Sequence, residues 1–93
     1  MARMSNRELI KSFINGATEG RSHTGNLYIS WNGARLVNYQ TCILMRTDNG
    51  WVFNSTRYSN TTSHIQSYVR YELERHGIGY KEVKGVKLGT CYL

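Results

Sequence analysis

The segment LYISWNGARLVNY at residues 27–39 decides the fold, because it carries the clearest β-hairpin pattern in the chain. Two runs rich in strand-forming residues, 27–31 and 34–39, flank the dipeptide Asn32-Gly33. Asparagine followed by glycine favours the left-handed backbone of a tight turn. The segment therefore predicts two antiparallel strands joined by that turn.

A second hairpin pattern follows directly along the chain. Residues 41–47 are rich in strand-forming side chains, and residues 51–54 return after the triplet Asp48-Asn49-Gly50. Turn-forming residues between two apolar runs predict that the runs pair as strands. The two hairpin patterns therefore predict four consecutive strands in the centre of the chain.

Before these strands the hydrophobic pattern has a helical period. Apolar side chains form one stripe in residues 6–14, and Asn15-Gly16 supplies residue types that end a helix. Ser5 and Glu8 have the spacing of a capping box, in which each side chain accepts the other's free backbone N–H. Residues 6–14 are therefore expected to form a short amphipathic helix.

A second helical pattern lies in the last third of the chain. Ser63 and Gln66 repeat the capping-box spacing, with Thr61 and Thr62 as rival caps, and His76-Gly77 is expected to end the helix. The predicted apolar face of this helix contains Ile65, Tyr68, Val69 and Leu73.

The rest of the chain has weaker patterns. Residues 17–26, which carry Arg21 and His23, read as a loop, and residues 78–83 and 85–93 alternate weakly enough to suggest one or two more strands. We expect one α+β domain over residues 1–93, with a small antiparallel sheet of four to five strands flanked by two helices. The expected order is α-β-β-β-β-α-β.

The composition is basic: twelve Lys and Arg face six Asp and Glu, for a net charge of +6. Such an excess favours binding to polyanions if the cations gather on one face. No apolar run is long enough to span a membrane, and the polar N-terminus lacks the apolar segment of a signal peptide. We therefore expect an intracellular, cytoplasmic protein.

Catalytic and metal-binding patterns are weak. Cys42 and Cys91 with His23, His64 and His76 lack the close pairing that zinc sites have, so we expect no metal and no cofactor. Thr61, Thr62 and Ser63 beside His64 are explained by helix capping without a nucleophile. The three histidines leave a small ribonuclease as an alternative, but we expect a non-enzymatic protein.

Aromatic residues interleave with basic ones along the chain. Trp31 lies near Arg35 in sequence, and several tyrosines lie near other arginines. Exposed rings on a sheet can stack on unpaired bases while arginines bind phosphates. The predicted contact residues are Arg57, Tyr58, His64, Arg70, Tyr71, Lys81, Lys84 and Lys87.

Two segments add a family resemblance. Residues 36–44 and 52–66 resemble a small protein family of phages and mobile elements, whose pattern is a YGTxIA strand followed by N-T-x-x-Y-S-x-T-T-S-x-H. The chain departs from that pattern at Gln40 and Cys42, where the family more often has glycine and proline. The resemblance implies a mobile-element origin more than a biochemical role. Because some small phage proteins are counter-defence factors, a phage-encoded inhibitor such as an anti-CRISPR protein is one specific interpretation.

The leading hypothesis is therefore a phage-type protein that binds nucleic acid or a nucleoprotein and inhibits a host defence nuclease. A basic inhibitor of this kind would engage guide RNA, the rim of a nucleic-acid channel or an acidic protein domain. The alternative is a protein-interaction adaptor without nucleic-acid contact.

Overall fold

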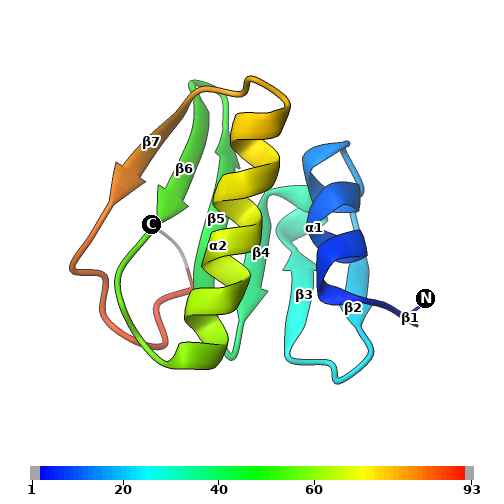
Figure 1. The fold of residues 1–93 in the computed structure, drawn as a ribbon. Helices are drawn as coiled ribbons and strands as arrows, with labels where there is room; N and C mark the ends of the chain where they lie inside the picture. Colours follow the sequence, from blue (N-terminus) through cyan, green and yellow to red (C-terminus); the bar gives the residue numbers. More distant parts are fainter. Residues whose placement is uncertain (1–2, 92–93) are drawn as a thin grey trace.

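The computed structural model describes residues 3–91, which form one mixed sheet and two α-helices (Figure 1). The helices are α1 (Asn6–Ile14) and α2 (Asn60–Arg75). The strands are β1 (Arg3–Met4), β2 (Gly20–Ser22), β3 (Leu27–Ser30), β4 (Arg35–Asn38), β5 (Thr41–Thr47), β6 (Gly50–Asn54) and β7 (Tyr80–Val83). A single 3-10 turn, η1 (Trp31–Gly33), joins β3 to β4.

The seven strands lie in the sheet in the order of the chain. Strands β2 to β6 are antiparallel, whereas β1 pairs with β2 and β6 pairs with β7 in parallel. A helix separates the two strands of each parallel pair, and such a crossover returns the chain in the same direction. The α+β class with two helices is confirmed. The expectation of an antiparallel sheet of four to five strands is only partly right, because the sheet has seven strands and its two edge pairs are parallel.

The additional strands are short. β1 has two residues and β2 has three, which is too few for a period of two to be recognised. The prediction that residues 17–26 form only a loop is therefore wrong at Gly20–Ser22. Within the described part of the 85–93 segment no strand forms, and residues 92–93 lie outside the described range.

Both predicted hairpins are confirmed. Leu27 pairs with Asn38 and Ser30 with Arg35, while Thr47 pairs with Gly50 across the second turn. A β-bulge interrupts the pairing of β4 with β5 between Leu36 and Val37.

Helix α1 has its predicted bounds and its predicted cap: the Ser5 side chain accepts the backbone N–H of Glu8. Helix α2 ends as predicted at His76, but it begins four residues earlier than the Ser63 cap implies. Its N-cap is Ser59, whose hydroxyl accepts the backbone N–H of Thr62 at 3.2 Å.

The Gln66 side chain has a different role from the predicted one in a capping box. It is buried and donates to the backbone carbonyls of Asn54 at 2.8 Å and Thr56 at 2.9 Å. These two hydrogen bonds hold α2 against the chain segment that leaves β6.

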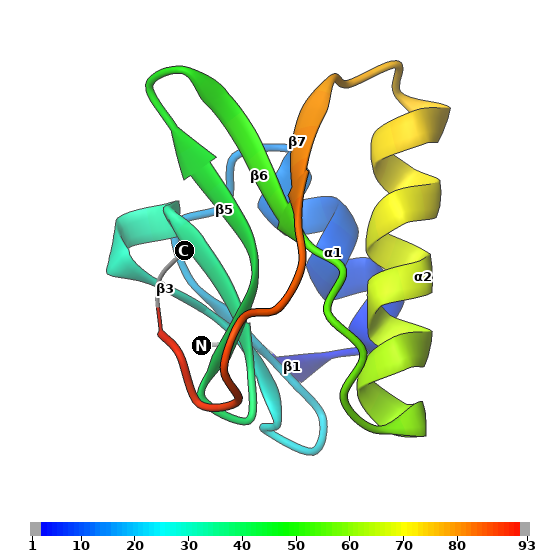
Figure 2. The same ribbon diagram turned by 90° about the vertical axis from the view of Figure 1, so that its left-hand side faces the viewer.

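Both helices pack on one face of the sheet, as the side view in Figure 2 shows. The apolar core lies between this face and the helices. From α2 it takes Ile65, Val69 and Leu73, as predicted, but Tyr68 is partly exposed. The other core residues with buried side chains are Leu9, Ile10, Phe13, Leu27, Ile29, Leu36, Ile43, Leu44 and Phe53.

The turn at η1 is held by a close approach of two loops. Gly33 has φ +90°, and a Cβ at this position would lie 2.9 Å from the carbonyl oxygen of Ala17 and 3.1 Å from the Cα of Thr18. Because both neighbours are backbone atoms, a side chain here forces the loops apart.

We expect Gly33→Ala to destabilise the protein by about 1–3 kcal/mol, from steric overlap and left-handed strain together. The measurement is urea unfolding followed by circular dichroism. Gly79→Ala is the control, since a Cβ there meets no atom within 4 Å and φ is not left-handed. Equal stability of the two variants would contradict the packing described for η1.

Candidate functional site

The face of the sheet opposite the helices carries no α-helix within residues 3–91. Paired residues on neighbouring strands point to the same face, so the strand register identifies the side chains there. One row across the sheet contains Arg3, Arg21, Tyr28, Val37 and Cys42. The next row contains Ser30, Arg35, Met45, Val52 and Lys81. These ten residues are here called the open face.

Two arginines of the open face are held in place by backbone carbonyls. The Arg21 guanidinium lies 4.8 Å from the centre of the Tyr28 ring and donates to the carbonyl of Gly25 at 3.0 Å. The Arg3 guanidinium donates to the carbonyl of Ser22 at 3.2 Å. The charge of Arg21 is therefore fixed beside the Tyr28 ring, and that of Arg3 is fixed on the neighbouring strand β1.

A second stack lies at the β3–β4 turn. The Arg35 guanidinium lies 4.0 Å from the centre of the Trp31 ring, and 66% of Trp31 is exposed to solvent. Trp31 has φ +54° and Asn32 has φ +53°, a backbone region that residues other than glycine rarely occupy. Such strain on a large exposed side chain is typical of functional sites. The turn holds the Trp31 ring at the edge of the open face.

Four of the six acidic side chains lie on the helix side of the molecule. Glu8 lies in α1, Glu72 and Glu74 lie in α2, and Glu82 turns toward α2 to pair with Arg70 at 3.0 Å. In contrast, no strand residue of the open face, all of them within the described range, carries a carboxylate. The ten residues of the open face therefore include four cations and no carboxylate, whereas the helix side carries cations and carboxylates together.

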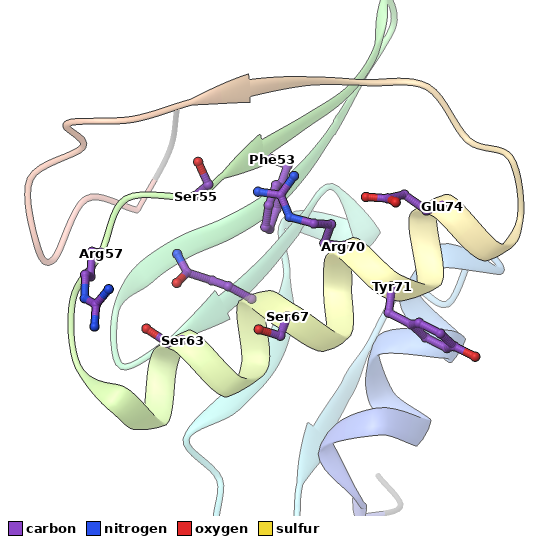
Figure 3. A pocket seen from close by; sticks show the side chains of 9 residues that line it. Phe53, Ser55, Arg57, Ser63, Ser67, Arg70, Tyr71 and Glu74 are labelled. Carbon is purple, nitrogen blue, oxygen red and sulfur yellow. The ribbon is translucent and has the colours of Figure 1, made fainter.

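The residues predicted as contacts do not gather in one place. Arg57, Arg70 and Tyr71 line a groove of about 380 Å³ between α2 and the segment that follows β6 (Figure 3). The Arg70 guanidinium lies over the ring of Phe53, 5.1 Å from its centre. This groove lies on the helix side of the sheet, away from the open face.

Two other predicted residues lie elsewhere. The Tyr58 hydroxyl donates to the carbonyl of Val86 at 2.7 Å and accepts from the Asn54 amide at 3.0 Å, so this tyrosine fastens the C-terminal segment. It also lines a separate hollow of about 450 Å³ with Tyr39 and Leu88. His64 is exposed on α2 and lines neither cavity.

The three predicted lysines are exposed but separated. Lys81 belongs to the open face, Lys84 lies 3.8 Å from the carboxylate of Glu82, and Lys87 lies in the C-terminal segment. Of the eight predicted residues, Lys81 alone is on the open face.

The residues that the predicted contact set omitted are Arg3, Arg21, Tyr28, Trp31 and Arg35. The alternation of the β3–β4 hairpin already carried part of this signal, because it places Tyr28 opposite the core residues Leu27 and Ile29. The spacing of Trp31 and Arg35, four positions apart across the predicted turn, was a further signal. Arg3 and Arg21 could not be placed because β1 and β2 were not recognised.

The Arg70–Glu82 pair has an electrostatic consequence. A hydrogen bond from Arg70 is the main cause that lowers the pKa of Glu82, and a hydrogen bond from Ser55 is the next. The same carboxylate raises the pKa of Arg70. Since the folded protein lowers the pKa of Glu82, the pair stabilises the fold above the ordinary glutamate pKa of about 4.3.

We expect this stabilisation to be lost as the pH falls through the lowered pKa of Glu82. Glu82→Gln should therefore unfold at lower urea concentration than the wild type at pH 7, and the difference should shrink below about pH 4. Urea titrations from pH 7 to pH 3 measure it. A difference that stays constant over this range would show that the Glu82 charge has no role.

Cys42 belongs to the open face but is buried, and burial raises the pKa of its thiol to about 12. Cys91 is exposed. Within residues 3–91, no group of three or more His, Cys, Asp or Glu side chains is placed to hold a metal ion.

Because the thiolate is the reactive form, Cys42 should resist iodoacetamide at pH 8 while Cys91 reacts. Mass spectrometry should show one added group on the folded protein and two after unfolding in urea. Rapid labelling of Cys42 in the folded protein would contradict its burial.

Comparisons of the chain with protein-family models, with curated proteins and with solved structures gave no match. In the described range neither helix has the length and apolar character needed to cross a membrane.

Proposed function

We propose that the protein binds single-stranded nucleic acid on the open face of its sheet. The observation that carries this proposal is the exposed Trp31 ring, stacked on Arg35 and held by a left-handed turn beside a face without carboxylates. An exposed aromatic ring stacks on any unpaired base, and nearby cations bind the phosphates.

The arrangement suits a single strand better than a duplex. Bases of a single strand are unstacked and can lie on a sheet, whereas duplex reading usually requires a helix or a ribbon that enters a groove. Here α1 and α2 lie on the opposite side of the sheet. The row of residues from Ser30 on β3 to Lys81 on β7 spans four spacings between β-strands, roughly 19 Å. This length offers an extended binding surface to a single-stranded nucleic acid.

Three cations supply phosphate contacts in this proposal: Arg3, Arg21 and Lys81. Arg21 presents its charge beside the Tyr28 ring, which offers a second stacking surface. The Arg35 guanidinium lies over one face of the Trp31 ring, and this cation–π contact polarises the ring.

The family resemblance supports a narrower form of the same proposal. In this form the bound strand is the guide RNA of a host defence nuclease, and occupation of the guide inhibits cleavage, as in an anti-CRISPR protein. Because the open face is basic, it complements the negative charge of RNA, whereas a basic nucleic-acid channel of the nuclease would repel it. The protein then acts by binding and not by catalysis.

The test is fluorescence anisotropy with labelled single-stranded RNA and DNA of the same sequence, and with the matching duplex. We expect single strands to bind more tightly than the duplex. Trp31→Ala should weaken binding about tenfold or more, since stacking on one base contributes about 1–3 kcal/mol. Arg21→Gln should weaken binding and reduce its salt dependence.

The helix side offers matched controls. Arg7 lies over the partly exposed ring of Tyr68 at 5.3 Å, so Tyr68→Ala and Arg7→Gln remove a similar stack on the other side of the molecule. These variants should bind like the wild type. If they lose as much affinity as the open-face variants, the open face is not the site.

The salt dependence of the binding affinity distinguishes nucleic-acid binding from the alternative, a protein-interaction adaptor. Three phosphate contacts give a slope of roughly −2 for the logarithm of the association constant against the logarithm of salt concentration. Absence of binding to any strand, or a flat salt response, would instead favour the protein-interaction adaptor. Cleavage of labelled RNA in chelator between pH 5 and 8 would favour the ribonuclease.

A further inference from the structure

The groove beside α2 is a concave feature on the helix side of the sheet, separate from the open face. Its walls are α2 and the segment that follows β6, and Phe53 lies at its base (Figure 3). Ser63, Ser67, Arg70 and Glu74 line it from one side of α2, spaced by three or four residues. Arg57 lines it from the opposite wall.

Positive charge at one end of the groove is only partly compensated. The Glu82 carboxylate accepts from Arg70 at 3.0 Å and from the Ser55 hydroxyl at 2.6 Å, and it lies 3.8 Å from the Lys84 ammonium group. One carboxylate thus serves two cations. Arg57 adds a third, and its exposed guanidinium contacts no carboxylate within residues 3–91.

The same end of the groove offers hydroxyl donors. The side chains of Ser63 and Ser67 lie one helical turn apart on the groove side of α2, and neither makes a hydrogen bond to another described residue. Glu74 lies at the other end, where it accepts from the Tyr80 hydroxyl at 3.3 Å. Glu74 lies eleven positions after Ser63 along the helix, a rise of about 16 Å.

We propose that this groove binds a phosphomonoester group, held by Arg57, Ser63, Ser67 and Arg70. A phosphomonoester carries a charge of about −1.5 to −2 at pH 7 and has three acceptor oxygens, which match two guanidinium groups and two hydroxyls. A volume of about 380 Å³ exceeds that of a phosphate alone, so the groove also has room for an attached sugar. The phosphate belongs either to a free mononucleotide or to the 5′ end of a strand.

The first experiment is an amide NMR titration with inorganic phosphate, adenosine monophosphate and adenosine. Both phosphates, but not adenosine, should shift the amide signals of residues 55–57 and 63–67 in a saturable way. Arg57→Gln should weaken phosphate binding at least about tenfold, because a charge-assisted hydrogen bond is lost. Ser67→Ala should weaken it less.

Arg7→Gln is the matched control, since it removes the same charge from α1, where Arg7 lies over the Tyr68 ring and lines neither the groove nor the open face. It should leave phosphate binding unchanged. Three results would overturn the proposal. Arg57→Gln and the wild type could respond equally, the shifts could spread over all basic residues, or no amide signal could shift at all.

A second arm separates the two sources of the phosphate. Oligonucleotides with a 5′-phosphate and with a 5′-hydroxyl are compared by anisotropy. If the terminal phosphate increases affinity in the wild type but not in Arg57→Gln, the groove receives a strand end; if only the mononucleotide binds there, the ligand is free. This inference does not rest on the open-face proposal, because the two sites are read from different signals. Groove binding shifts the amides of residues 55–57 and 63–67, whereas phosphate contacts at the open face would shift those of β1, β2 and β7.

Discussion

One-sided packing of both helices on the sheet is the constraint on which the rest of the structure depends. The core cluster side chains of β3 to β6 face α1 and α2, and every residue of this cluster belongs to that single interface. Val37 and Cys42 are also buried, but on the other face of the sheet. Burial of the interface with the helices is the main favourable term in folding. A small chain can build one such interface, so the second face of the sheet is left for other residues. In this protein those residues are arginines stacked on aromatic rings.

The same constraint explains the groove. Helix α2 connects two parallel strands, β6 and β7, and therefore lies across them on the core side. Gln66 fixes its first half to the segment after β6, and the Arg70–Glu82 pair fixes its second half to β7. The space between these two attachments is the groove. The fold thus yields two separate polar surfaces, one on each side of a single sheet.

Much of the centre of the fold could be predicted from the sequence, because both hairpins carry strong local turn signals. The start of α2 could not, since Ser59, Thr61, Thr62 and Ser63 are all residue types that cap helices. A long-range contact selects among them: the Thr62 hydroxyl donates to the Asn38 side chain at 2.9 Å, which requires Thr62 inside the helix. The edge strands β1 and β2 also depend on tertiary pairing.

The candidate site was only partly accessible from sequence for the same reason. The sequence identifies basic and aromatic residues as the candidate contact residues. Which of them lie together depends on which β-strands are neighbours in the sheet. Arg21 and Tyr28 meet only because β2 pairs with β3. Arg70 appeared to be a free cation in the sequence, whereas Glu82, twelve residues further on, pairs with it through the parallel β6–β7 arrangement.

The most direct test of the central claim uses the two tryptophans as internal reporters. Trp31 is exposed beside the open face, whereas Trp51 packs on the helix side against Phe13, with ring centres 5.6 Å apart. On titration with a single-stranded oligonucleotide, we expect the indole N–H signal of Trp31 to shift and that of Trp51 to stay in place. A shift of Trp51 alone, or no shift of Trp31 under conditions where the strand binds, would contradict the account.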